Sequence, residues 1–249
     1  MSKQKDFEAL LLRLSKCCSL VILTLQIPDV VCGFDRLESL SRLHTVRELN
    51  LSGENITIPK EWILPHTLQK LRIKDSYFFN GFIVPSTLQT LRISGGRGRL
   101  SLDLNSATSL VALYIRMERD CGPLIAPLRV RPRWLQLRVC SICVYPAESV
   151  PSCLLPALGS AMEKLTLCTD GFFYPAEGTL AENQWSNLAL LHLGRHIDLS
   201  KWVTILNKTA HGLKSLTLRS RIFISMAASH TIDHNHCVAD IIEYSCSGK

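Results

Sequence analysis

Two short stretches in the middle of the chain decide the fold, LQKLRI at residues 68–73 and LQTLRI at residues 88–93. Both follow the pattern apolar-x-x-Leu-x-apolar, in which the Leu and the last apolar residue are separated by one polar residue. Alternation with a period of two predicts a short β-strand with one buried face and one free face.

The same pattern extends outward from these stretches over almost the whole chain. Nine windows begin at residues 20, 46, 68, 88, 110, 134, 162, 188 and 213, at spacings of 26, 22, 20, 22, 24, 28, 26 and 25 residues. The fourth position reads as Leu in each window: Leu23, Leu49, Leu71, Leu91, Leu113, Leu137, Leu165, Leu191 and Leu216. Because one such unit cannot close a core alone, stacked units share one apolar interior, and the predicted fold is an α/β solenoid.

These windows resemble the leucine-rich-repeat family over about residues 6–225, and FNGFIVPSTL at residues 79–88 resembles the FNIP subtype. The resemblance implies a curved solenoid, with parallel strands lining the concave face and helices or irregular segments on the convex face. The chain departs from the family at the Asn or Cys position after the strand, which holds unrelated residues such as Pro28, Glu54 and Ser76.

Three regions follow from this pattern. We expect an N-terminal capping helix within residues 1–19, a solenoid of about nine repeats over residues 20–225, and a C-terminal cap or poorly ordered tail over residues 226–249. Apolar residues every three positions from Phe34 to Leu43 indicate a further helical segment. Another helix is expected from a cap at Ser200 to a stop at His211-Gly212.

Composition favours a folded, soluble, intracellular protein. Of the 249 residues, 47% are hydrophobic and 20% are charged, which is enough to bury a core. The apolar stretch near the N-terminus is broken by Arg13 and Lys16, and no run is long enough to span a membrane. Ten scattered cysteines without an export signal suggest reduced thiols, so we expect a cytoplasmic or nuclear location.

The free face of the predicted sheet concentrates positive charge. Positions three, five and seven of the windows hold one acid, Glu48, against eight basic residues: Lys70, Arg72, Lys74, Arg92, Arg116, Arg138, Lys164 and Arg219. The predicted partner-binding residues are the central ones: Lys70, Arg72, Lys74, Arg92, Tyr114, Arg116 and Arg138. A polar face that is merely solvated is the alternative. The GGRGR stretch at residues 95–99 and the arginines between residues 129 and 133 are interpreted mainly as basic turns.

Two cysteine-containing clusters could hold metal. Cys140 and Cys143 have the spacing of half a zinc site or a redox pair, and His230, His234, His236 and Cys237 lie close together in the tail. No second pair completes the first cluster, and the tail shows no clear helix, so we expect structural cysteines, no metal and no cofactor. Catalytic sequence motifs are absent, and we expect a protein that is not an enzyme.

The predicted function is a protein–protein interaction module that binds an acidic macromolecular partner through the concave face. An alternative rests on a second resemblance, to the leucine-rich-repeat parts of F-box proteins, which implies a substrate adaptor of a ubiquitin ligase. Residues 1–19 are too short for an F-box. Binding of RNA or a phosphate ligand along the arginines is the other alternative.

Overall fold

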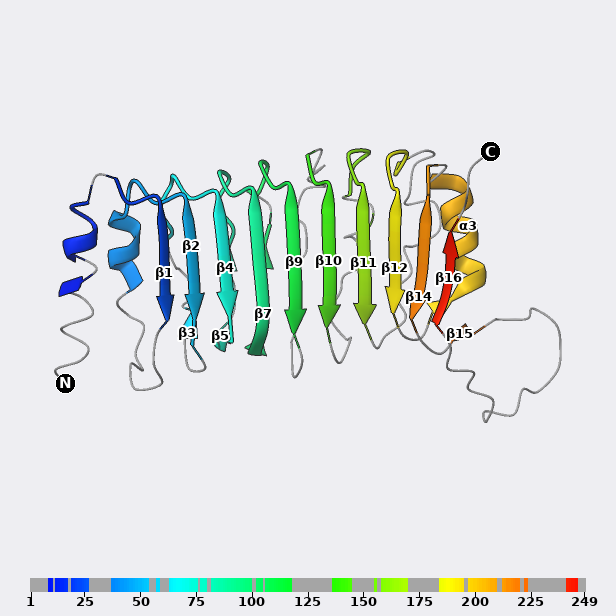
Figure 1. Ribbon diagram of the computed structural model, residues 1–249, viewed down its shortest axis with the longest axis horizontal. Coiled ribbons are helices and arrows are strands. Elements are labelled where there is room, and N and C mark those ends of the chain that lie inside the picture. Colours follow the sequence, from blue (N-terminus) through cyan, green and yellow to red (C-terminus); the bar gives the residue numbers. More distant parts are fainter. Residues whose placement is uncertain are drawn as a thin grey trace.

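The chain forms a solenoid whose main feature is one continuous sheet of strands lying side by side (Figure 1). The computed structural model describes residues 9–10, 12–17, 19–26, 37–53, 57–58, 63–75, 77–79, 82–99, 102–104, 106–117, 136–144, 155, 158–169, 184–194, 197–209, 212–219, 222–223 and 241–245.

Successive repeats contribute successive strands to this sheet. In chain order they are β1 (Ile22–Gln26), β2 (Glu48–Ser52), β4 (Lys70–Lys74), β7 (Thr90–Arg99), β9 (Ala112–Met117), β10 (Val139–Val144), β11 (Lys164–Thr169), β12 (Leu190–Gly194) and β14 (Ser215–Arg219). Each pairs in parallel with the next. Strand β16 (Ile241–Ser245) then pairs antiparallel with β14. The predicted solenoid of parallel strands is confirmed.

Three columns of apolar side chains form the core beneath the sheet. Register places the fourth window positions, except that of the sixth window, in one column from Leu23 through Leu71 and Leu91 to Leu216. The first and sixth positions form the other two columns, and most members of all three are buried. Each apolar side chain therefore packs against its equivalents in the neighbouring repeats, which explains why the units need one another.

Hydroxyl groups join neighbouring repeats at the turns before β2, β4 and β7. The Oγ1 atoms of Thr45, Thr67 and Thr87 donate to the carbonyl oxygens of Leu20, Val46 and Leu68, at 2.9, 2.9 and 3.1 Å. These bonds satisfy carbonyl groups at the edge of the core, which would otherwise be costly to bury. A ladder of side-chain hydrogen bonds therefore lies at the start of the strands. The position at which this chain lacks the Asn or Cys of the leucine-rich-repeat pattern follows the strands, at their other end.

The segments that return from one strand to the next are partly β-structure. Strand β3 (Thr57–Ile58) pairs with β5 (Tyr77–Phe79), which pairs with the second half of β7. Strand β6 (Phe82–Ile83) pairs with β8 (Leu102–Asp103), and β13 (Ile197–Asp198) with β15 (Ile222–Phe223).

The described helical residues lie toward the two ends of the solenoid (Figure 1). They are residues 9–10 and 12–14, a 3₁₀ helix at Leu37–Arg42, and α3 at Leu199–Thr209, and the single described helical residue between them is Leu155. None of these is long and apolar enough to cross a membrane. Helices are therefore few among the described residues, and the described return segments between β2 and β9 contain short strands instead.

Both helices predicted inside the solenoid form, with altered details. The apolar spacing of three around Leu40 matches the three residues per turn of a 3₁₀ helix. Helix α3 begins at Leu199, so Ser200 lies within its first turn and is not its cap. Trp202 is its buried anchor, and the helix ends at Thr209.

The GGRGR stretch is not a turn, which corrects the interpretation from sequence. It forms the second half of β7, beyond a register shift between Ser94 and Gly96, and it pairs with β5. Gly95 has a φ of 69°, and a Cβ atom on it would lie 2.0 Å from Oδ1 of Asp75. Glycine is needed here because the backbone is left-handed and the neighbouring carboxylate occupies the Cβ position.

Replacing Gly95 with Ala is expected to lower the free energy of unfolding by about 1–3 kcal/mol. The added Cβ atom is unfavourable in a left-handed backbone and would clash with the Asp75 carboxylate. Chemical denaturation measures the loss. An Asp75→Gly background removes the carboxylate, and the same Gly95→Ala change should cost less there. An equal loss in both backgrounds would contradict the proposed contact.

Candidate binding surface on the exposed sheet face

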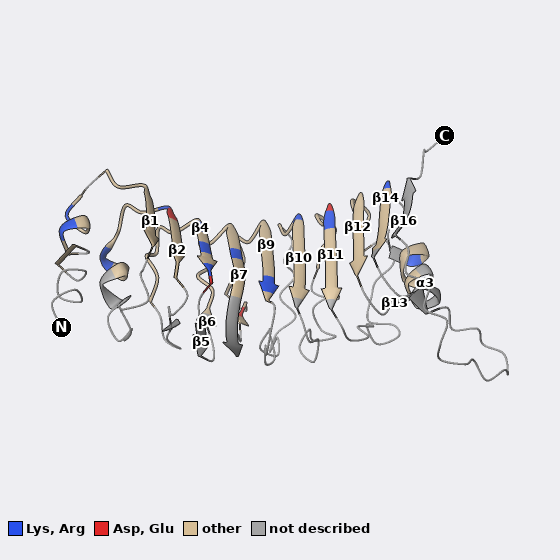
Figure 2. Ribbon diagram, turned by 60° about the horizontal axis from the view of Figure 1, so that its bottom comes forward, with Lys and Arg blue, Asp and Glu red and all other residues tan. Residues whose placement is uncertain are grey.

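The candidate site lies on the face of the sheet opposite the core, across the middle strands. It consists of six side chains from β4, β7 and β9, which we call the basic face: Lys70, Arg72, Lys74, Arg92, Tyr114 and Arg116. They alternate along each strand with core residues such as Leu71 and Ile73, so strand periodicity alone turns them outward. Figure 2 shows the Lys and Arg residues on these three strands.

Two arginines stand at the centre of the basic face. Arg72 and Arg92 are directly paired across β4 and β7, and both side chains are exposed. Adjacent strands lie about 4.8 Å apart, and like charges directly opposite each other are destabilising. An anion bound between the two guanidinium groups would relieve this repulsion.

The third strand adds an aromatic ring and another cation. Arg92 pairs with Tyr114 on β9, and its Cζ atom lies 5.7 Å from the centre of the Tyr114 ring. This is within cation–π distance, so the contact restrains both side chains. Arg116 lies two residues further along the same face of β9.

Carboxylates contact the margins of the basic face and not its centre. Glu48 lies 3.6 Å from the Lys70 ammonium, and Asp75 lies 3.4 Å from that of Lys74. Such exposed ion pairs are weak. Within the residues that the structure describes, no carboxylate forms an ion pair with Arg72 or Arg92.

The sixth window was assigned wrongly from the sequence, by three residues. Cys140 and not Leu137 pairs with Leu113 and Leu165 in the fourth-position column. The window therefore starts at Leu137, a buried first-position residue, and not at residue 134. Its spacing to the neighbouring windows becomes 27 residues from 110 and 25 residues to 162. Cysteine fills the column as a small apolar residue, so a pattern defined by Leu does not include it.

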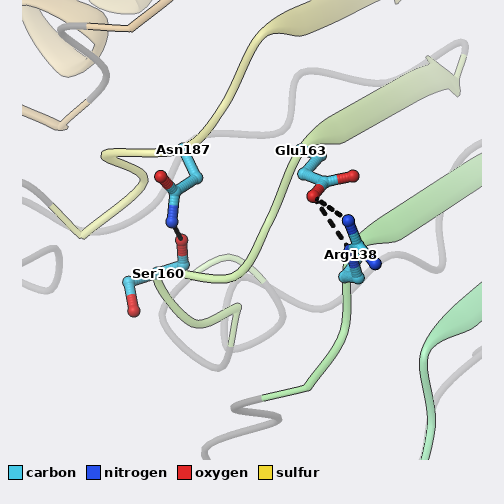
Figure 3. A network of polar contacts seen from close by, with 4 residues as sticks. All are labelled: Arg138, Ser160, Glu163 and Asn187. Carbon is cyan, nitrogen blue, oxygen red and sulfur yellow. Dashed lines mark hydrogen bonds and ion pairs between the residues drawn. The ribbon is translucent and has the colours of Figure 1, made fainter.

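This register removes Arg138 from the predicted binding surface. Arg138 lies just before β10, where its Nε donates to Oε1 of Glu163 at 2.9 Å (Figure 3). The hydrogen bond and the charge of Glu163 raise the pKa of Arg138. Ser141 takes the central exposed position of β10 instead. The basic track therefore ends at Arg116 on β9.

Lys164 and Arg219, the remaining predicted basic positions of the windows, lie on strands away from the basic face. Lys164 is exposed at the start of β11, two strands beyond β9. Arg219 lies at the end of β14, further along the sheet. The arginines between residues 129 and 133 lie outside the described residues.

Neither candidate metal cluster is assembled in the described part of the chain. Cys140 points into the core, whereas Cys143, three residues along the same strand, has the opposite parity and lies on the exposed face. One metal ion could not bind both. The histidines of the tail, with Cys237, lie outside the described residues, and the described residues contain no group of three or more possible metal ligands.

The basic face is therefore an exposed, positively charged strip of three strands with one aromatic ring. Of the seven predicted partner-binding residues, the structure brings six together and separates Arg138. A scan of protein-family models and a search of curated proteins found no match to the chain.

Proposed function

We propose that this chain is a leucine-rich-repeat solenoid of the cytoplasm or nucleus that acts as a non-catalytic binding module for an acidic segment of a protein partner. The repeat identity is supported by the nine windows and by the three core columns that they build. The described cysteines Cys17, Cys140, Cys143 and Cys168 form no disulfides, as is usual in reducing compartments.

The observation that carries the proposal is the paired Arg72 and Arg92 at the centre of the basic face. Their guanidinium groups are exposed and mutually repelling, and Lys70 and Lys74 lie on either side of Arg72 on β4. Arginine is suited to carboxylates because its planar group can donate two parallel hydrogen bonds. Carboxylates of a partner would supply the missing negative charge.

The spacing of the cations fits an acidic peptide. Along β4, Lys70, Arg72 and Lys74 lie on one face at intervals of two residues, about 6.6 Å apart. Alternate residues of an extended peptide have the same spacing, so every second Glu or Asp could meet a cation. Across the strands the interval is about 4.8 Å, which lets one carboxylate contact both arginines.

RNA fits the basic face less well. Single-stranded RNA binding relies on aromatic rings that stack with successive bases. Among the described residues of the basic face, Tyr114 is the one aromatic side chain, and Arg92 already contacts it. The face therefore offers charge with little stacking surface.

The proposal is tested with two labelled probes of equal charge, a short oligoglutamate peptide and an oligouridylate. Fluorescence anisotropy at about 0.15 M ionic strength should show saturable binding of the peptide and weaker binding of the RNA. Tighter binding of the RNA, with an affinity that falls steeply with salt, would favour nucleic-acid recognition instead. Saturable binding of neither probe would leave a solvated face and overturn the proposal.

A further inference from the structure

Two thiols meet on the exposed face, one strand beyond the basic face. Cys143 on β10 and Cys168 on β11 are direct partners in the parallel register. Arg116 on β9 pairs with Cys143 on the other side, and Gly194 on β12 pairs with Cys168. The four residues form a row across four strands, with the two cysteines in the middle.

The spacing of this pair suits a disulfide. Directly paired residues on adjacent strands are separated by about the strand spacing of 4.8 Å. Disulfides form across Cα–Cα distances of about 4.4–6.8 Å. The two thiols are already in side-chain contact, since Cys168 forms a hydrogen bond with Cys143. Little backbone movement is needed to join the two sulfur atoms.

Cys143 and Cys168 differ in exposure, so an oxidant in solution would reach Cys143 first. Cys143 is half-buried and reaches solvent, whereas Cys168 is only 8% exposed. A Cβ atom on Gly194 would lie 2.9 Å from Sγ of Cys168, so the absence of a side chain there makes room for that sulfur. Cys143 is accessible to a small solute, whereas Cys168 beside it is buried.

The surroundings of Cys143 also favour its thiolate. The pKa of Cys143 is lowered to about 7, mainly by the hydrogen bond from the Cys168 thiol. Partial burial opposes this shift, whereas the Ser141 hydroxyl and the charge of Arg116 add to it. Burial in the core raises the pKa of Cys140, on the opposite face of the strand, to about 12. The thiolate is the reactive form of cysteine, so the two thiols of one strand should differ greatly in reactivity.

We propose that Cys143 and Cys168 form an oxidative modification site, at which a peroxide attacked by Cys143 leads to a Cys143–Cys168 disulfide. The Cys143 thiolate attacks one peroxide oxygen, the O–O bond breaks, and the sulfur is oxidised to a sulfenic acid while the peroxide is reduced. The hydroxide or alkoxide released takes up a proton. The Cys168 sulfur then attacks the sulfenic sulfur, the S–O bond breaks, and hydroxide leaves with the Cys168 proton as water.

Oxidation of the reduced full-length chain with hydrogen peroxide tests this proposal by mass spectrometry. Wild type should lose two hydrogen atoms and give a tryptic cross-link between the peptides 139–164 and 165–195. Cys143→Ser should abolish that cross-link. Cys168→Ser keeps a hydrogen-bond donor but no second thiol, so oxidation should stop at a sulfenic acid on Cys143, which dimedone traps.

Cys140→Ala serves as the control, because Cys140 lies in the same tryptic peptide as Cys143. The cross-link to the peptide 165–195 should persist in this variant. A cross-link that survives Cys143→Ser, or oxidation of wild-type Cys143 without a disulfide to Cys168, would overturn the proposal. Oxidation of Cys17 before either Cys143 or Cys168 would also overturn the proposal.

Alkylation of the unoxidised chain gives a second readout. The groups that face Cys143 from its neighbouring strands are Arg116 and Cys168, and both favour the thiolate. Labelling of Cys143 by iodoacetamide should therefore be rapid above pH 7 and fall as the pH drops through about 7, while Cys140 stays unlabelled in the folded chain. At pH 7, Cys143 should react about fivefold faster than free cysteine. Equal labelling of Cys140 and Cys143 would contradict the placement of Cys140 in the core and of Cys143 on the exposed face.

Discussion

Replacing Arg72 and Arg92 together with Glu is expected to weaken oligoglutamate binding by at least about 100-fold. A hydrogen bond to a charged group contributes about 1.5–3 kcal/mol, and 1.4 kcal/mol corresponds to a tenfold change in affinity. Two such contacts are lost, and each new carboxylate also repels the peptide. Anisotropy titration of the variant against wild type measures the change.

A matched control separates this effect from the change in net charge. Lys164→Glu with Lys214→Glu reverses the same number of charges at exposed sites away from the basic face. This variant should bind the peptide within a few-fold of wild type, because the contact surface is intact. Equal weakening in both variants would mean that the peptide senses overall charge, and the basic face would lose its assigned role.

Replacing Leu91 with Ala is expected to lower the free energy of unfolding by about 2–5 kcal/mol. Leu91 is fully buried in the fourth-position column, and its register partners are Leu71 on one side and Leu113 on the other. A cavity here interrupts the column between two repeats. Because each repeat of a solenoid contacts only its neighbours, the loss weakens both interfaces at once.

The preceding residue provides the control for this core substitution. Thr90 belongs to the same strand but lies on the exposed side, half-buried, so Thr90→Ala should change stability by no more than about 0.5 kcal/mol. Urea denaturation followed by circular dichroism compares the two variants. Equal losses would contradict the assignment of the two faces of β7.

The sequence was sufficient to predict most of the main sheet, because one physical signal repeats along it. A buried Leu followed two residues later by another apolar residue marks a strand whatever surrounds it. Eight of the nine windows, all except the sixth, have the predicted register. The sixth failed because Cys140 takes the place of Leu, while Trp134, Leu137 and Val139 match the same pattern three residues earlier.

The return segments were harder to predict, since their structure depends on pairing between repeats. Glycines at residues 95, 96 and 98 indicate a turn when read locally. In the folded chain they extend β7, because β5 of the preceding repeat supplies a pairing partner. Tertiary context overrides the local preference there, as it often does for strands.

The basic face was largely predictable for the same reason as the sheet. Once the register of β4, β7 and β9 is right, alternation fixes which side chains are exposed, and Lys70, Arg72 and Arg92 follow. Arg138 was misplaced by the same shift that affected Cys140. The Cys143–Cys168 pair was missed because the two cysteines lie 25 residues apart and meet only through the corrected register.

Mapping of bound oligoglutamate by NMR tests the central claim most directly. In a titration of the isotope-labelled chain, the largest amide shift changes should fall on β4, β7 and β9, around Arg72, Arg92 and Tyr114, with little change in β12 and β14. Changes centred on β12 and β14, or spread evenly over the chain, would contradict the assignment of the basic face as the binding surface.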